Sequence, residues 1–228
     1  MKKLFSLSLI LLLYSITFAQ FKQIAASNEF NEPRGSSALL LMKNGNLVLA
    51  EIGPRDSIRI RIYNKAYQEI AATSYAMLNA KRTSLSLNKA LEINGEVVLF
   101  VNATEEKTWI LYRVIIDPNS GQVKNEKYLL ELKPEARNES SAVWRGNFSI
   151  SKAADSDDYA IAYCNNYQSE KVKTIKVILF NKENVEVVRS YYETAEKEFE
   201  SLTFRGLVVV NAETAALLFM GYPWKDGD

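Results

Sequence analysis

The chain has 228 residues, with 28 Lys and Arg against 27 Asp and Glu, no histidine and one cysteine. The lack of histidine excludes Ser-His-Asp and Cys-His catalysis, a histidine general base and the usual zinc sites, and we expect no cofactor. Because the charges nearly balance, the composition gives no sign of the excess positive charge that binds nucleic acid or an anionic membrane. Cys164 has no second cysteine to bridge and lies in an apolar run, which predicts a buried, inert thiol.

The first 20 residues predict a secretory signal peptide. After a short basic start, Leu4 to Phe18 is apolar, and small residues precede a cleavage point after Ala19 or Gln20. This run is shorter than the ~18 residues that a spanning helix needs, and polar residues follow it, so we expect no membrane segment after cleavage. The expected location is the periplasm, the outer-membrane surface or the extracellular space.

Residues 36–75 predict a four-stranded antiparallel meander. Asn44-Gly45 separates two apolar runs, and Asn-Gly is the strongest short hairpin signal because a type I′ turn needs positive φ at both central residues. In the third run Ile58, Ile60 and Ile62 alternate with two arginines, which predicts a strand with one face on a core. The four predicted strands are Ala38 to Met42, Leu47 to Ile52, Ser57 to Tyr63 and Tyr67 to Ser74.

The same pattern of short apolar runs and turn residues returns in three further units, residues 84–132, 146–193 and 204–228, of which the last is incomplete. Their spacing is at or beyond the long end of the about 40 to 50 residues of a propeller blade. The predicted strands are Leu85 to Leu91, Val97 to Val101, Trp109 to Ile116, Val123 to Leu130, Phe148 to Ser151, Tyr159 to Cys164, Thr174 to Phe180, Val185 to Tyr192, Leu207 to Val210 and Ala215 to Met220.

These units resemble the degenerate repeats of bacterial exported β-propellers, in which an Asn-Gly or Asp-Gly hairpin joins the first two strands. The signal peptide resembles those of Gram-negative bacteria of the Bacteroidetes type. The resemblance implies an all-β chain whose residues 21–228 form one domain, a partial β-propeller of four-stranded antiparallel meanders, with further blades in a longer protein. A β-sandwich is the alternative architecture.

Two groups of residues are candidate sites. Trp144 and Arg145 lie in the predicted loop before the third unit and suit the binding of a protein or glycan partner. Asp155, Asp157 and Asp158 place alternating carboxylates in one turn, as a Ca²⁺ site requires, although Ca²⁺ takes 6 to 8 oxygen ligands and a solvated hairpin explains the same residues.

The sequence therefore predicts an exported binding or interaction module of the cell envelope or extracellular space, with no nucleic-acid partner. The alternative is a carboxylate-based glycan hydrolase or lyase on a propeller scaffold. That chemistry needs no histidine, only an acid and a base or nucleophile roughly 5 to 10 Å apart. A purely structural array of blades within a larger secreted protein is the third possibility.

Overall fold

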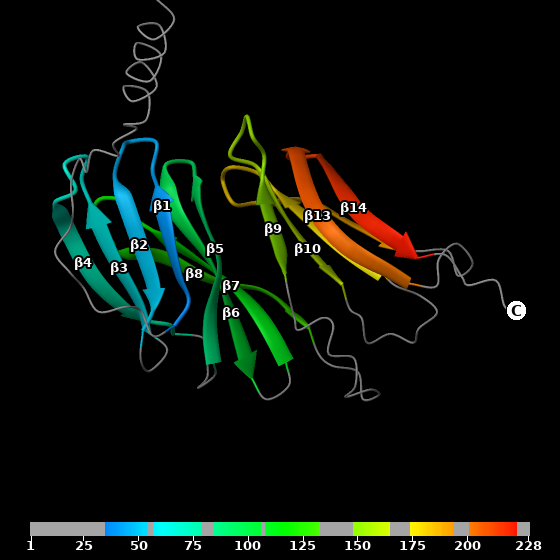
Figure 1. Ribbon diagram of the computed structural model, residues 1–228, viewed down its shortest axis with the longest axis horizontal. Helices are drawn as coiled ribbons and strands as arrows, with labels where there is room; N and C mark the ends of the chain where they lie inside the picture. Colours follow the sequence, from blue (N-terminus) through cyan, green and yellow to red (C-terminus); the bar gives the residue numbers. More distant parts are fainter. Residues whose placement is uncertain are drawn as a thin grey trace, which may run out of the picture. The chain divides into compact units, whose positions relative to one another are not determined.

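The computed structural model describes residues 35–53, 57–78, 84–105, 108–132, 148–164, 174–193 and 201–222. Within these ranges the chain is all-β, and its strands form antiparallel sheets that we number 1 to 4 in chain order (Figure 1). The described residues contain no helix long and apolar enough to cross a membrane.

Each sheet is built from one contiguous stretch of chain, with its strands hydrogen-bonded in sequence order. Sheet 1 comprises β1 (Ser37–Leu41), β2 (Leu47–Ile52), β3 (Ser57–Tyr63) and β4 (Glu69–Ala76). Sheet 2 comprises β5 (Ser84–Ile93), β6 (Glu96–Glu105), β7 (Thr108–Ile116) and β8 (Val123–Leu132). Sheet 3 comprises β9 (Ser149–Lys152), β10 (Tyr159–Cys164), β11 (Thr174–Phe180) and β12 (Glu186–Glu193), and sheet 4 comprises β13 (Ser201–Asn211) and β14 (Thr214–Tyr222). The predicted antiparallel meanders are thereby confirmed.

The hairpin predicted at Asn44-Gly45 is confirmed, but the turn does not have type I′ geometry. Of these two residues only Gly45 has a positive φ, of 86°. The Gly45 N–H donates to the Met42 carbonyl at 2.8 Å, and the Met42 N–H donates to the Asn46 carbonyl at 2.8 Å. The register of β1 and β2 explains the difference. Residues 42–46 separate the last paired residues of the two strands, so the loop is longer than the two residues of a type I′ hairpin and contains a glycine in the left-handed conformation. The type I′ geometry occurs instead at Asn94-Gly95, where φ is 51° and 75° and only these two residues separate the paired ends of β5 and β6.

The core between sheets 1 and 2 follows from strand alternation. The three isoleucines of β3, Ile58, Ile60 and Ile62, are fully buried on the face of sheet 1 that packs against sheet 2. The core face predicted for this strand is therefore confirmed. The side chains of sheet 2 that meet it include Val97, Leu99, Val101, Ile110, Tyr112 and Val114.

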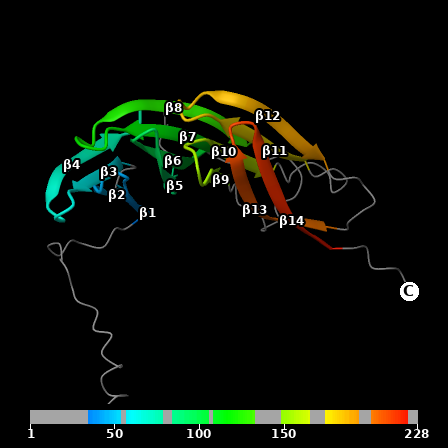
Figure 2. The ribbon, with the colours of Figure 1, turned by 90° about the horizontal axis from the view of Figure 1, so that it is seen from above.

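Sheets 2 and 3 are each buried on both faces. On β6 the residues between those that face sheet 1, Val98 and Phe100, pack with Tyr159 and Ile161 of sheet 3. The opposite face of sheet 3 packs against sheet 4 through a cluster that contains Ala153, Ala160, Ala162, Val177, Leu179, Leu207 and Val209. Strands buried on both sides are apolar at consecutive positions, which explains why β6 and β10 have almost continuous apolar sequences. The sheets thus follow one another in chain order, from cyan through green to orange and red (Figure 2).

The first strand of sheet 2 lies against sheet 1, and the first strand of sheet 4 lies against sheet 3. Strand β5 contacts β1 and β2, and β13 contacts β9 and β10. Hydrogen bonds join the sheets at this level: the Leu87 N–H donates to Ser36 Oγ at 2.6 Å, and Asn88 Nδ2 donates to the Phe148 carbonyl at 3.0 Å. Sheet 2 is therefore connected to sheets 1 and 3 by polar contacts near their first strands as well as by apolar faces.

Candidate functional site

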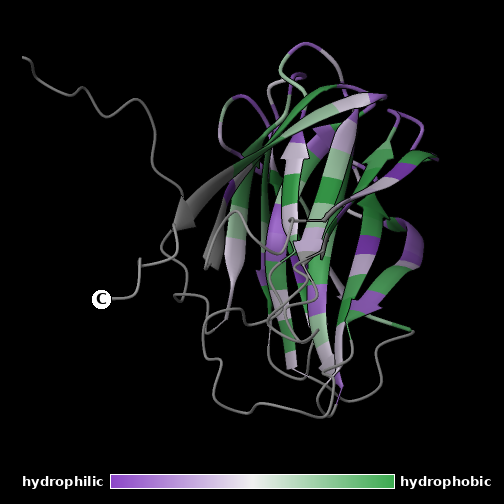
Figure 3. Ribbon diagram, turned by 90° about the vertical axis from the view of Figure 1, so that its right-hand side faces the viewer, coloured by the Kyte–Doolittle hydropathy of each residue, from purple (hydrophilic) through white to green (hydrophobic). Residues whose placement is uncertain are grey.

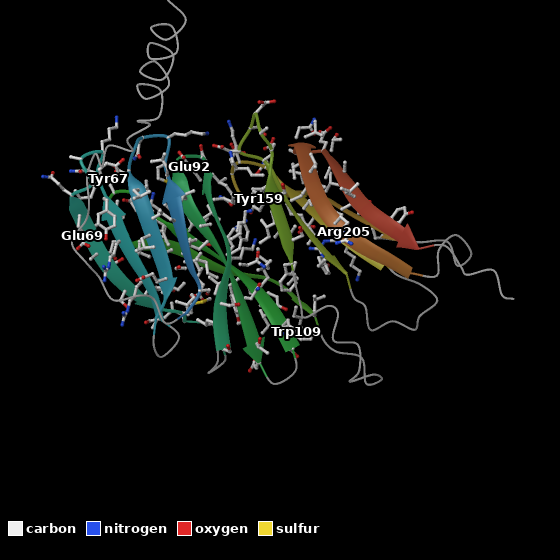
Figure 4. All side chains as sticks on the ribbon, in the orientation of Figure 1. Tyr67, Glu69, Glu92, Trp109, Tyr159 and Arg205 are labelled. Atoms are coloured by element: carbon white, nitrogen blue, oxygen red, sulfur yellow. The ribbon has the colours of Figure 1, made fainter. Side chains whose placement is uncertain are left out.

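The hairpin turns of sheets 1, 2 and 3 meet in one polar cluster, which we call the turn network: Lys43, Glu92, Asn94, Lys152 and Asp157. Glu92 of this network is labelled in Figure 4. Asp157 Oδ1 accepts from Lys43 Nζ at 3.0 Å and from Lys152 Nζ at 2.8 Å, while Oδ2 accepts from the Asn94 N–H at 2.9 Å. The Lys43 N–H donates to Glu92 Oε2 at 2.7 Å. One carboxylate thus holds three turns from three different sheets.

The surroundings of Asp157 keep its carboxylate ionised. Burial acts to raise its pKa, but the hydrogen bonds from Lys152, Lys43 and the Asn94 N–H outweigh that effect and lower the pKa to about 2. A carboxyl with this pKa does not carry the proton that a general acid must donate near neutral pH. The arrangement supports a structural role for Asp157, in which its carboxylate connects the turns of three sheets.

The predicted metal ligands are Asp155, Asp157 and Asp158. Asp155 is exposed, whereas Asp158 accepts from Ser156 Oγ at 2.8 Å and from the Lys182 N–H at 3.2 Å. Over the described ranges, no group of three or more His, Cys, Asp or Glu side chains is placed to hold a metal ion. Two of the three carboxylates have protein partners, and calcium binding by this loop stays a prediction.

The other predicted site residues lie elsewhere. Trp144 and Arg145 fall between β8 and β9, outside the described residues, so ligand binding by this pair stays a prediction. Cys164 ends β10, where its backbone pairs with Ile175, and its side chain is outside the described part.

A buried arginine that the sequence pattern did not single out lies between sheets 2 and 3. Arg113 on β7 is 4% exposed, and its Nη1 donates to Tyr159 Oη at 2.7 Å and to the Asn184 carbonyl at 2.9 Å. Its guanidinium carbon lies 5.8 Å from the centre of the Phe180 ring. Within the described residues, Arg113 Nε has no hydrogen-bond partner.

Tyr159 completes this cluster, and it is labelled in Figure 4. Its hydroxyl donates to Asn184 Oδ1 at 3.1 Å, and its ring stacks on Phe180 with centroids 4.9 Å apart. Burial raises the pKa of Tyr159 to about 12, against the opposing effect of Arg113, so the phenol stays neutral at physiological pH. The sequence pattern could have indicated this cluster. Because side chains alternate along a strand, Arg113 lies on the same face of β7 as Leu111 and Ile115, both of which are buried against sheet 3.

The low pKa of Asp157 predicts a pH dependence. A carboxyl whose pKa falls from the usual value of 3.8 to about 2 on folding stabilises the protein above about pH 4 and loses that contribution as the pH falls toward 2. Asp157→Asn should lower the free energy of unfolding by about 2 kcal/mol at pH 7, and its difference from the parent protein should vanish by about pH 2. Urea unfolding at a series of pH values measures this difference.

The matched control for that measurement is Asp155→Asn, since Asp155 is an exposed carboxyl in the same turn. We expect its effect to stay within about 0.5 kcal/mol at every pH. A difference between Asp157→Asn and the parent protein that is independent of pH contradicts the assignment of the ion pairs.

The chain matches no protein-family model and no curated protein, so its function has to be inferred from its geometry.

Proposed function

We propose that the protein is an exported β-propeller-like module that binds a protein or glycan partner in the cell envelope or outside the cell. The observation that carries the proposal is the repeat of four-stranded antiparallel meanders, whose apolar faces pack against one another in chain order. Propeller blades are arranged in this way. Export rests on the signal peptide predicted for residues 1–20.

A binding role fits the polar groups better than catalysis does. One fold can host many functions, so the side chains are better evidence of function than the fold is. In the turn network the best-placed carboxylate, Asp157, is occupied by two lysines and a backbone amide. Trp144 and Arg145 lie in the connection between sheets 2 and 3, and Trp and Arg are residue types enriched at the energetic centres of interfaces.

The experiment has two stages on one preparation. The full chain is expressed in a Gram-negative host, and mass spectrometry of the exported protein should show cleavage after Ala19 or Gln20. The purified mature protein is then applied to an array of bacterial and host glycans and to immobilised envelope proteins. Trp144→Ala should weaken any binding at least tenfold, as expected for loss of an interface anchor.

Two controls make the result decisive. Leu11→Arg with Leu12→Arg interrupts the apolar run and should retain the uncleaved chain in the cytoplasm. Tyr191→Ala removes an exposed aromatic side chain of β12 and should leave binding unchanged. Retention of residues 1–20 in the parent protein overturns the export proposal, and sugar release that one Asp or Glu substitution abolishes favours the hydrolase or lyase instead.

A further inference from the structure

We propose that the turn between β3 and β4 is a contact site for an uncharged glycan, with the ring of Tyr67 stacked on a sugar ring. The site rests on the binding role proposed above, and it adds the class of partner and a residue that meets that partner. It is a turn whose backbone favours glycine but which carries an exposed tyrosine instead.

Four of the described turns close in the same way. In each, the N–H of the first residue donates to the carbonyl of the last, and the N–H of a left-handed residue donates to the carbonyl of the first. These turns are residues 42–46, 64–68, 117–122 and 181–185. Their left-handed residues are Gly45, Tyr67, Gly121 and Asn184, with φ of 86°, 59°, 71° and 64°.

At three of the four positions the surroundings explain the residue. A Cβ on Gly45 would displace the side chain of Lys65, and a Cβ on Gly121 would lie 2.9 Å from Thr73 Oγ1. Asparagine tolerates the left-handed region, and the side chain of Asn184 accepts a hydrogen bond at 3.1 Å in the buried cluster between sheets 2 and 3. Packing therefore accounts for each of these three residues.

Packing does not account for Tyr67, which is labelled in Figure 4. Its side chain is 48% exposed, and among the described residues its hydroxyl has no hydrogen-bond partner and its ring no aromatic partner. The left-handed conformation is unfavourable for a bulky residue. Backbone strain that the fold does not require is a feature of functional sites, so we assign Tyr67 to binding.

The groups beside Tyr67 suit the hydroxyls of a sugar. Asn64 Nδ2 donates to Gln68 Oε1 at 3.0 Å, and Gln68 Nε2 has no partner within the described part of the chain. Amide groups both donate and accept hydrogen bonds, as sugar hydroxyls do, and the apolar face of an aromatic ring suits the C–H face of a sugar ring. Figure 3 shows the turns at the upper end of the strands mostly in purple and white, with little green.

The charges and the apolar area at this turn favour a sugar over a protein. Within residues 64–70 the charged side chains are Lys65 and Glu69, one of each sign. Ile70, 48% exposed, is the other large apolar side chain exposed in this range. The centre of a protein interface usually holds several aromatic or aliphatic anchors in one patch. A single ring beside amide groups, with balanced charge, fits an uncharged sugar better.

The test measures binding and stability on the same variants of the mature protein. Affinity gel electrophoresis with laminarin, xylan, glycogen and hydroxyethyl cellulose should find a polysaccharide that slows the parent protein. Tyr67→Gly and Tyr67→Asn remove the ring but place a residue that tolerates the left-handed conformation. Each should bind that polysaccharide at least tenfold more weakly, with a urea midpoint equal to or above that of the parent protein.

Two controls accompany these variants. Tyr67→Phe keeps the ring and removes the hydroxyl, so it should bind within threefold of the parent protein. Tyr191→Ala removes a tyrosine of β12 that is 67% exposed, and it should leave binding unchanged. Together they separate loss of the Tyr67 ring from a general loss of exposed aromatic surface.

Four outcomes overturn the site. A urea midpoint below that of the parent for both Tyr67→Gly and Tyr67→Asn shows that the ring supports the fold. Glycan binding that survives both substitutions places the contact elsewhere and leaves the proposed binding function standing. A parent protein that binds immobilised envelope proteins but none of the glycans has a protein partner instead. A parent protein that binds neither class overturns the proposed function as well.

Discussion

Arg113→Ala is expected to lower the free energy of unfolding by about 3 kcal/mol. The substitution removes a buried side chain from between sheets 2 and 3, and the carbonyl of Asn184, which accepts from Arg113 Nη1 at 2.9 Å, loses that donor. Tyr159 Oη also loses the hydrogen bond that it accepts from Nη1 but keeps the one that it donates to Asn184 Oδ1, so the loss comes from the cavity and from two lost hydrogen bonds, of which the one at the Asn184 carbonyl leaves that oxygen unpaired. Urea unfolding at neutral pH measures it.

Arg113→Met separates packing from charge. Methionine fills much of the arginine volume beside Phe180 and also removes the cost of burying a guanidinium for which the structure gives no carboxylate partner in the described part. We expect Arg113→Met to cost about 1 kcal/mol or less. Equal losses for the two variants would mean that the hydrogen bonds of the guanidinium, and not its volume, hold the sheets together here.

Ile60→Ala is expected to cost about 3 kcal/mol. Ile60 is at the centre of β3, fully buried, in the cluster between sheets 1 and 2. Truncation loses the transfer free energy of three carbon atoms and leaves a cavity that the two rigid sheets cannot close. The measurement is again the shift of the urea midpoint at an unchanged slope.

Its matched control is Arg59→Ala, one residue earlier on the same strand, because Arg59 is exposed on the opposite face. We expect a change within about 0.5 kcal/mol. Similar losses at the two positions would contradict the assignment of the face of sheet 1 that packs on sheet 2.

The strands were largely predictable because local patterns determine them. The predicted bounds of β2, β3, β10 and β11 agree with those observed, since alternation or a short apolar run ends at clear turn residues in each. Strand β13 was predicted from Leu207 and begins at Ser201 instead. Its register shifts between Phe204 and Gly206, and this irregularity with its glycine interrupts the alternation on which the prediction relied.

The contacts between sheets were not predictable in the same way. Lys43 and Asp157 are 114 residues apart, and nothing local to either turn indicates that they meet. Their contact depends on how the sheets stack, which the apolar pattern of each strand leaves open. The backbone conformation of Tyr67 was also not predictable from the sequence. Tyr67 adopts a φ of 59°, in a region where glycine or asparagine is expected, because the turn between β3 and β4 has the same hydrogen-bond pattern as the turn at residues 42–46.

The contiguity of each sheet has a consequence for how the chain reaches its folded state. Residues 37–76 contain every strand of sheet 1, and residues 84–132 every strand of sheet 2, so a sheet can pair its strands before the next one has left the ribosome. Each new sheet then meets an apolar face that is already formed, and only short loops need to close at any step. A chain built in this order can fold in the direction in which it is made.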